Sequence, residues 1–126
     1  RIVGDGSPEA HAKGRKALLA AYEAGYNHFD HANIYGRGAC ESLHGKLFKE
    51  LPELRARSIV TTKCGIRQSR DGSTGLYDFS REHILAEAEA SLKRLGLDAI
   101  DVLLLHRPDY LFHPDEVAGA FSELLA

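Results

Sequence analysis

The sequence contains no tryptophan and no methionine, and only two of its 126 residues are cysteines. Cys40 and Cys64 lie far apart in the chain and have none of the paired spacings typical of metal or redox sites. Such sparse cysteine use suits a reducing compartment, so we expect a cytoplasmic protein. No segment has the pattern of a signal peptide.

The chain also lacks an excess of basic residues and a long apolar run. It has 16 Lys and Arg against 18 Asp and Glu, a net charge of −2, so there is no basic field to hold nucleic acid or an anionic membrane. The longest apolar run, Ile100 to Leu105, is interrupted by Asp101 and is far too short to span a bilayer. We therefore expect neither a nucleic acid nor a membrane as partner.

What the sequence does have is a regular alternation of helical and strand patterns. Ser7 and Pro8 are typical of a helix start, and Gly25 of a helix end. Further helices are expected around 43–51, stopped by Pro52, over 80–96, and from 114 onward. Strands are expected over 26–30, 58–63 and 99–105. The last of these strands is nearly all apolar, so we expect it to be the most buried.

The segments between these elements carry expectations of their own. Residues 67–79 are polar and without period, and we expect a long loop there. Residues 53–57 are rich in charge and are expected to form a solvated turn. In the last helix, Val117, Phe121 and Leu124 are expected to face inward.

Strands that alternate with helices predict right-handed crossovers and a parallel sheet. No Gly-x-Gly-x-x-Gly follows any expected strand, so the dinucleotide fingerprint of the open, doubly wound sheet is missing. This favours an α/β fold of the (β/α)8 TIM-barrel type. A complete barrel needs about 250 residues. We therefore expect residues 1–126 to form one incomplete domain, about the N-terminal half of a barrel, with both ends cut from a longer chain.

Ionisable side chains stand where the expected strands end. Asp30 ends the first strand and Tyr35 follows it, Lys63 ends the second, and His106 ends the third. The carboxyl ends of parallel strands carry the active site in such folds, so these four side chains are expected at one rim. Lys63 would be costly to bury without a counter-charge, and Asp30 on the neighbouring strand is the expected partner.

Together these residue types form a proton-donor unit. Tyrosine is a weak acid near neutral pH, and a nearby ammonium favours its phenolate form. Asp30 would keep Lys63 oriented, while His106 would hold a carbonyl oxygen beside the hydroxyl of Tyr35. Protonation of that oxygen while a hydride reaches the carbon is carbonyl reduction. No residue here carries a hydride, so a nicotinamide must be bound.

Four segments resemble motifs of the aldo-keto reductase family. Asp30 to Gly36 is similar to the motif with the catalytic aspartate and tyrosine, and Ile59 to Lys63 resembles the strand with the catalytic lysine. Glu89 to Asp109 is similar to the segment that ends on the catalytic histidine. Glu41 and Gly45 fit the helix that follows the first motif. The variant residues, such as His31, resemble those of a bacterial oxidoreductase branch. The resemblance covers about residues 15–126.

The resemblance implies NADPH-dependent reduction of aldehydes or ketones, small-molecule carbonyl substrates, to alcohols. Tyr35 would be the general acid, Lys63 and Asp30 its tuning pair, and His106 the residue that orients the carbonyl. Asp30 would also touch the cofactor. The family's first strand is not recognisable in residues 1–6, and most of its cofactor contacts would follow residue 126. The segment alone is therefore expected to be inactive, and its open sheet edges favour self-association.

Two other functions stay open at this point. A barrel of the same family can serve as a non-catalytic, cofactor-sensing subunit of a larger assembly. A metal-dependent barrel hydrolase would use strand-end residues such as His28 and Asp30, but only His106 is available as a third ligand, so we predict no metal. Four further histidines are expected to be solvated: His11, His44, His83 and His113. Cys64 is expected to be a small buried residue, and Arg107 either a ligand contact or a rim charge.

Overall fold

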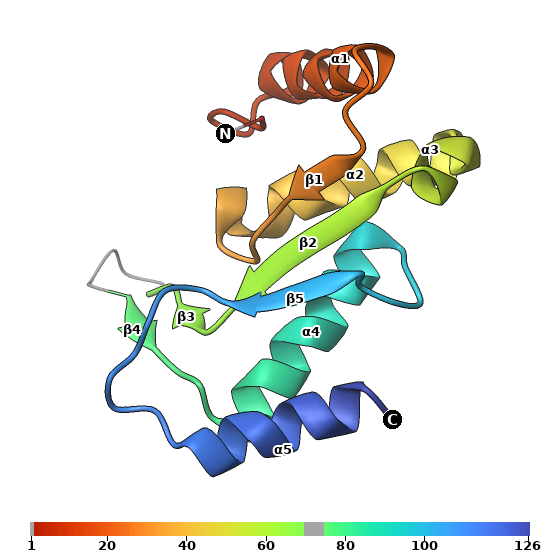
Figure 1. Ribbon diagram of the computed structural model, residues 1–126. Coiled ribbons are helices and arrows are strands. Elements are labelled where there is room, and N and C mark those ends of the chain that lie inside the picture. Colours follow the sequence, from red (N-terminus) through yellow and green to blue (C-terminus); the bar gives the residue numbers. More distant parts are fainter. Residues whose placement is uncertain (1, 70–74) are drawn as a thin grey trace.

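The computed structural model describes residues 2–69 and 75–126 (Figure 1). The helices are α1 (Pro8–Glu23), α2 (Ala39–Glu50), α3 (Pro52–Ala56), α4 (Arg81–Leu95) and α5 (Pro114–Leu124), and a 3-10 turn, η1 (Tyr35–Gly38), precedes α2. The strands are β1 (His28–Asp30), β2 (Ile59–Cys64), β3 (Ile66–Arg67), β4 (Leu76–Tyr77) and β5 (Val102–Leu105).

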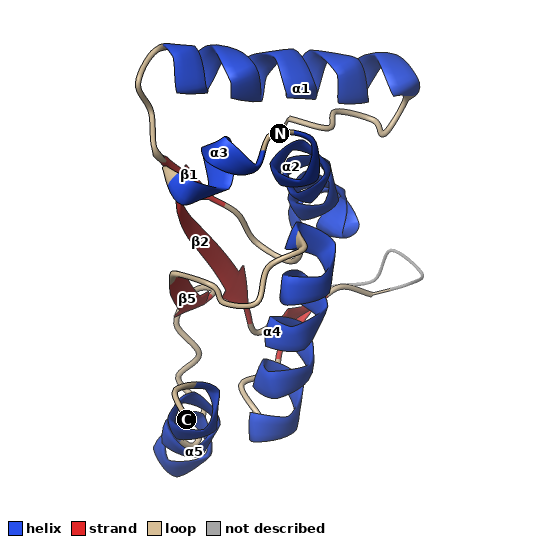
Figure 2. Cartoon of the chain, turned by 90° about the vertical axis from the view of Figure 1, so that its right-hand side faces the viewer, coloured by secondary structure: helices blue, strands red, loops and turns tan. Residues whose placement is uncertain are grey.

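The described residues form a three-stranded parallel sheet in the order β1-β2-β5. The strands thus lie side by side in the order in which the chain makes them, without the reversal of an open doubly wound sheet (Figure 1). Figure 2 shows α2 and α4 along the same face of this sheet. Parallel strands in sequential order, with their crossover helices on one face, form an arc of an α/β barrel.

The helix starts follow from local hydrogen bonding. The side chain of Ser7 accepts a hydrogen bond from the backbone N–H of Ala10 at 3.1 Å, and Pro8 occupies the first turn of α1. Ser80 caps α4 in the same way through the N–H of His83. Gly96 ends α4 in the left-handed conformation, with φ of 66°, which glycine adopts without strain. The sequence predicts each of these ends correctly.

The apolar core lies between the sheet and its helices. Phe29 of β1, Val60 of β2 and Leu47 of α2 are all buried in it. The opposite face of the sheet, which would line a barrel interior, exposes Ile59, Val102 and Leu104. Successive residues of each strand point to opposite faces, as the strand period of two requires.

The prediction that the third strand is the most buried is wrong. In the described sheet β5 is an edge strand, and Val102 and Leu104 are 36% and 43% exposed. The central strand β2 has four buried residues instead: Val60, Thr61, Thr62 and Cys64. An apolar run shows that a strand is suited to burial on both faces, but neighbouring strands decide whether it is buried.

Three smaller predictions also need correction. Residues 53–57 were expected as a solvated turn, yet Pro52 begins the short helix α3, which buries Leu54. The expected loop 67–79 includes the last residue of β3 and the whole of β4, which pair antiparallel, while its residues 70–74 lie outside the described part of the chain. Leu124 is 39% exposed rather than inward-facing, because the buried position of α5 is Ala120.

Gly45 marks a close contact between α2 and α4. A Cβ added there would lie 2.7 Å from the carbonyl oxygen of Leu95 and closer still to that of Arg94. We expect Gly45→Ala to lower the free energy of unfolding by about 1–3 kcal/mol, because the added methyl forces the two helices apart. Chemical denaturation followed by circular dichroism measures the change.

Gly119 provides a matched control on α5. Among the described residues, a Cβ at this position would meet only the Cδ atom of Arg81, at 3.7 Å. Gly119→Ala is expected to raise the stability by up to about 1 kcal/mol, because alanine is the better helix former. Equal stabilities of the two variants would contradict the close helix contact at Gly45.

Candidate active site

The carboxyl ends of the three parallel strands bring the predicted site residues together. Asp30 is the last residue of β1, Lys63 is the penultimate residue of β2, and His106 directly follows β5. The ammonium of Lys63 donates to both carboxylate oxygens of Asp30 at 2.6 Å. The predicted pairing of Asp30 with Lys63 is therefore confirmed.

Tyr35 begins η1 and lies against the same group. The Nζ atom of Lys63 is 5.2 Å from the centroid of the Tyr35 ring. The rings of Tyr35 and His106 meet edge to face, with centroids 5.9 Å apart. All four predicted residues thus form one cluster, although η1 belongs to a connection and not to a strand.

Partial burial sets the electrostatics of this cluster. The side chain of Lys63 is 14% exposed, whereas that of Asp30 is 57% exposed. The ammonium is thus largely shielded from water, while one side of the carboxylate stays open. Burial lowers the pKa of His106, and the charges of Lys63 and Arg107 lower it further. His106 is therefore neutral near pH 7.

A neutral imidazole has one N–H donor and one acceptor nitrogen. The Nδ1 atom of His106 is buried and makes no hydrogen bond within the described part of the chain. The backbone N–H of His106 is held by the carbonyl oxygen of Cys64 at 2.7 Å, which fixes the residue to the end of β2. A neutral imidazole at a fixed position, as in His106, is suited to orient an oxygen atom through a hydrogen bond and not through a charge.

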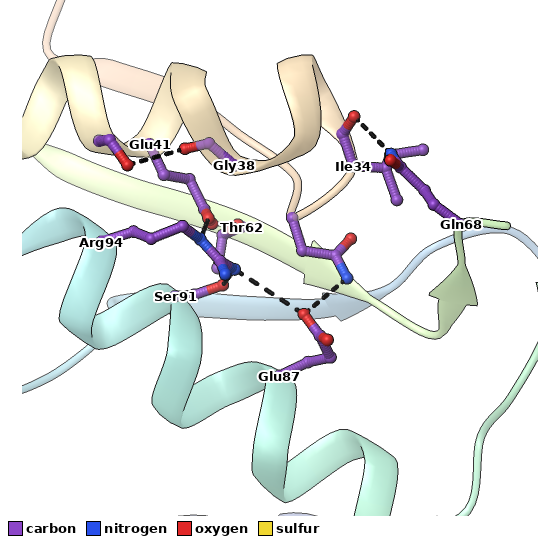
Figure 3. Close-up of polar contacts among 10 residues, drawn as sticks. Ile34, Gly38, Glu41, Thr62, Gln68, Glu87, Ser91 and Arg94 are labelled. Carbon is purple, nitrogen blue, oxygen red and sulfur yellow. Dashed lines mark hydrogen bonds and ion pairs between the residues drawn. The ribbon is translucent and has the colours of Figure 1, made fainter. Parts of the chain in front are cut away.

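The connection that carries Tyr35 is held by three hydrogen bonds. The backbone N–H of Asn33 donates to the carbonyl oxygen of Lys63 at 3.0 Å, and its side-chain amide donates to Glu87 at 2.9 Å. Gln68 donates to the carbonyl oxygen of Ile34 at 2.7 Å (Figure 3). These contacts hold the backbone just before Tyr35, so the position of the phenol depends on β2 and α4.

Behind this connection lies a buried ion pair. Glu41 of α2 is fully buried and accepts hydrogen bonds of 2.5 Å from Thr62 and from the guanidinium of Arg94 (Figure 3). Arg94 also donates to Ser91. The sequence indicated Glu41 only through the family motif. Its structural role is to join α2, β2 and α4 beneath the rim.

His44 was expected to be solvated, and this prediction is wrong. The residue is fully buried in α2 and bonds to Tyr22 and His31. A signal was present in the sequence, because helical spacing places His44 on the same stripe as Cys40 and Leu47. Its imidazole can be buried because both ring nitrogens find partners.

The remaining predictions have simpler outcomes. Cys64 is buried as expected, and burial raises the pKa of its thiol to about 12. Arg107 is exposed at the rim with φ of 74°. His28 bonds to Thr61 at 2.7 Å. Among the described residues no group of three or more His, Cys, Asp or Glu side chains is placed to hold a metal. No helix in that part of the chain has the length and apolarity to span a membrane.

The fold and the site define a segment of an α/β barrel with tyrosine, lysine, aspartate and histidine at the rim of its strand ends. The chain belongs to the aldo/keto reductase family, whose model matches residues 4–126. The predicted fold class is therefore confirmed: these residues are part of a TIM barrel of that family.

Individual relatives cover most of the chain. Oxidoreductase YdhF of Escherichia coli is 43% identical over 104 residues, which are 81% of this chain and 35% of the relative. The "Putative voltage-gated potassium channel subunit beta" of Schizosaccharomyces pombe is 42% identical over 88% of this chain and 32% of its own length. The solved aldo-keto reductase AKR11C1 from Bacillus halodurans, in its holo form, superimposes with a TM-score of 0.84 at 31% identity. That match covers 98% of this chain and 39% of the solved one. The chain thus spans about a third of its curated relatives.

Proposed function

We propose that the protein containing these residues is an NADPH-dependent oxidoreductase that reduces an aldehyde or ketone to an alcohol. The observation that carries the proposal is the ammonium of Lys63, held by Asp30 at 2.6 Å and placed against the ring of Tyr35. A tyrosine beside a fixed ammonium is suited to give up a proton. A location in the cytoplasm and self-association through the edge of β5 belong to the same proposal.

The residues present fit a nicotinamide cofactor at the rim. The carboxylate of Asp30 remains 57% exposed although it binds Lys63, so it can touch a bound group on its open side. The nicotinamide supplies the hydride when it is bound. In the proposed reaction Tyr35 donates a proton to the carbonyl oxygen, and Lys63 stabilises the phenolate that remains. Neutral His106 donates a hydrogen bond to the same oxygen and orients it.

Turnover by the natural protein that contains these residues tests the proposal. Incubation with NADPH and a panel of small aldehydes and ketones is expected to deplete NADPH, measured by its absorbance, in step with alcohol formation. The same assay with NADH decides the cofactor preference. NADPH that stays intact with every carbonyl compound, although it binds to the protein, would contradict the proposed activity.

A second function is supported by one specific observation. The 42% identical relative from Schizosaccharomyces pombe bears the name of a potassium channel subunit. A cofactor-sensing subunit would bind NADPH without appreciable turnover and would associate with a membrane protein. Binding measured by fluorescence titration, together with the turnover assay, distinguishes the two functions. Tight binding without turnover favours the subunit, and turnover favours the reductase.

A further inference from the structure

A row of buried hydrogen bonds runs beneath the candidate site, and the proposed reaction does not use it. It joins Ser58 to Tyr22 at 2.7 Å, Tyr22 to His44 at 2.8 Å, and His44 to His31 at 2.8 Å. All four side chains are buried, from 0% exposure for His44 to 7% for Ser58. Burial lowers the pKa of both histidines, that of His44 to about 3, so both are neutral near pH 7.

Which group donates in each hydrogen bond of this row follows from Ser58, at the end of the row. Ser58 donates its one hydroxyl proton to the carbonyl oxygen of Leu54 at 2.6 Å. Ser58 must therefore accept from Tyr22, whose own proton is then used. Tyr22 in turn accepts from the Nε2–H of His44. A neutral His44 then has only Nδ1 left as an acceptor, and it receives the Nε2–H of His31.

The row ends at the residue that holds Lys63. The carbonyl oxygen of His31 accepts from the Lys63 ammonium at 2.8 Å. The two oxygens of Asp30 accept the ammonium's other hydrogen bonds, so His31 supplies one of three acceptors. The backbone N–H of His31 donates to the carbonyl oxygen of Thr61 at 2.8 Å, which fixes the peptide before its Cα. The carbonyl that faces Lys63 belongs to the next peptide, and the side chain of His31, held by His44, is a second anchor on the Cα between the two.

His44 is itself rigidly placed. Its ring stacks on Phe48, with centroids 4.2 Å apart, and meets Phe29 edge to face at 4.8 Å. The acceptor nitrogen that faces His31 is therefore fixed by the packing of α2 against β1. A side chain that is locked by packing can define the position of a neighbour through one hydrogen bond.

We propose that His44, acting through His31, is a positioning residue that sets the place of the Lys63 ammonium beside Tyr35. The expected effect of His44 on the reaction rate rests on the proposed carbonyl reduction. Its expected effect on the position of Lys63 rests on the hydrogen-bond geometry alone.

Two substitutions in the natural protein test the proposal. His44→Leu removes the acceptor for His31 and is expected to lower kcat about 10-fold with little change in KM, because a misplaced ammonium weakens catalysis more than binding. His44→Asn keeps an acceptor oxygen near the place of Nδ1 and loses the donor to Tyr22. Its kcat is expected to stay within about 3-fold of the wild type.

The kcat values of the two His44 variants distinguish a positioning role of His44 from a role in stabilising the core alone. A residue that only stabilises the fold would lower the unfolding free energy in both variants and leave kcat unchanged in both, which would overturn the proposal. His11→Leu is the control, because His11 lies on α1 outside this row of hydrogen bonds. It is expected to leave kcat unchanged.

Nuclear magnetic resonance of the wild-type protein tests the geometry even if His44→Leu does not fold. With ¹⁵N-labelled histidine, both rings are expected to be neutral at pH 7 with the proton on Nε2. A charged His44, or one with its proton on Nδ1, would overturn the proposal. The Lys63 ammonium signal is expected to shift in His44→Asn less than in a folded His44→Leu. If the wild type reduces no carbonyl compound, the proposed function fails, and the Lys63 ammonium signal alone tests the positioning role of His44. A signal unmoved in His44→Leu rejects this role, and a shifted signal supports it.

Discussion

Tyr35→Phe is expected to lower kcat at least about 100-fold in the natural protein, the low end of what a general acid contributes. The substitution removes the hydroxyl that gives its proton to the carbonyl oxygen. It leaves the ring in place against Lys63 and His106, so the fold of the cluster is preserved. Steady-state turnover of NADPH with the best aldehyde of the panel measures the loss.

The affinity for NADPH should not change in this variant, because the hydroxyl is needed for proton donation and not for cofactor binding. Tyr26→Phe is the matched control, since Tyr26 is 67% exposed and lies outside the cluster. It should keep wild-type kcat. Turnover of Tyr35→Phe at the wild-type rate would show that another group is the acid.

Lys63→Met is expected to lower kcat by about 100-fold as well. Methionine has nearly the length of lysine but no charge, so the phenolate left on Tyr35 after proton donation loses its stabilising ammonium. Asp30 also loses its partner, which carries two hydrogen bonds of 2.6 Å in the wild type. Rate measurements at saturating NADPH separate this effect from any loss of cofactor affinity.

Asp30→Asn should have the same effect to a smaller extent. The amide keeps one acceptor for Lys63, and the carbonyl oxygen of His31 still holds the ammonium at 2.8 Å. Lys49→Met on the exposed face of α2 is the control for loss of a lysine charge. If Asp30→Asn were more harmful than Lys63→Met, the main role of Asp30 would be its contact with the cofactor or substrate, and its pairing with Lys63 would be secondary.

The position of the site could be predicted because it depends on the ends of strands. A strand ends where its apolar pattern ends, and parallel strands have their carboxyl ends at one edge, so Asp30, Lys63 and His106 had to meet. The pairing of Asp30 with Lys63 followed from the cost of burying a lone ammonium. Neither step needed knowledge of how the helices pack.

The surroundings of the site could not be predicted in the same way. The helical spacing of His44 shows that it faces the core, but not that Tyr22 and His31 meet it there, since these side chains come from α2, α1 and the connection after β1. The exposure of Val102 depends on whether a further strand lies beside β5. The ion pair of Glu41 with Arg94 joins residues 53 positions apart along the chain.

The sequence by itself thus determined the order of elements, the helix caps and the residues at the strand ends, because each depends on a few neighbouring residues or on a simple period. Only the tertiary structure decided which buried polar groups are partners and which apolar faces are covered. Those outcomes depend on distances between elements far apart in the chain. The orientation of the Lys63 ammonium belongs to this second kind. The bonds that hold it come from Asp30 at the end of β1 and from His31 just after it. The row of hydrogen bonds that reaches His31 begins at Leu54 of α3 and passes through α1 and α2.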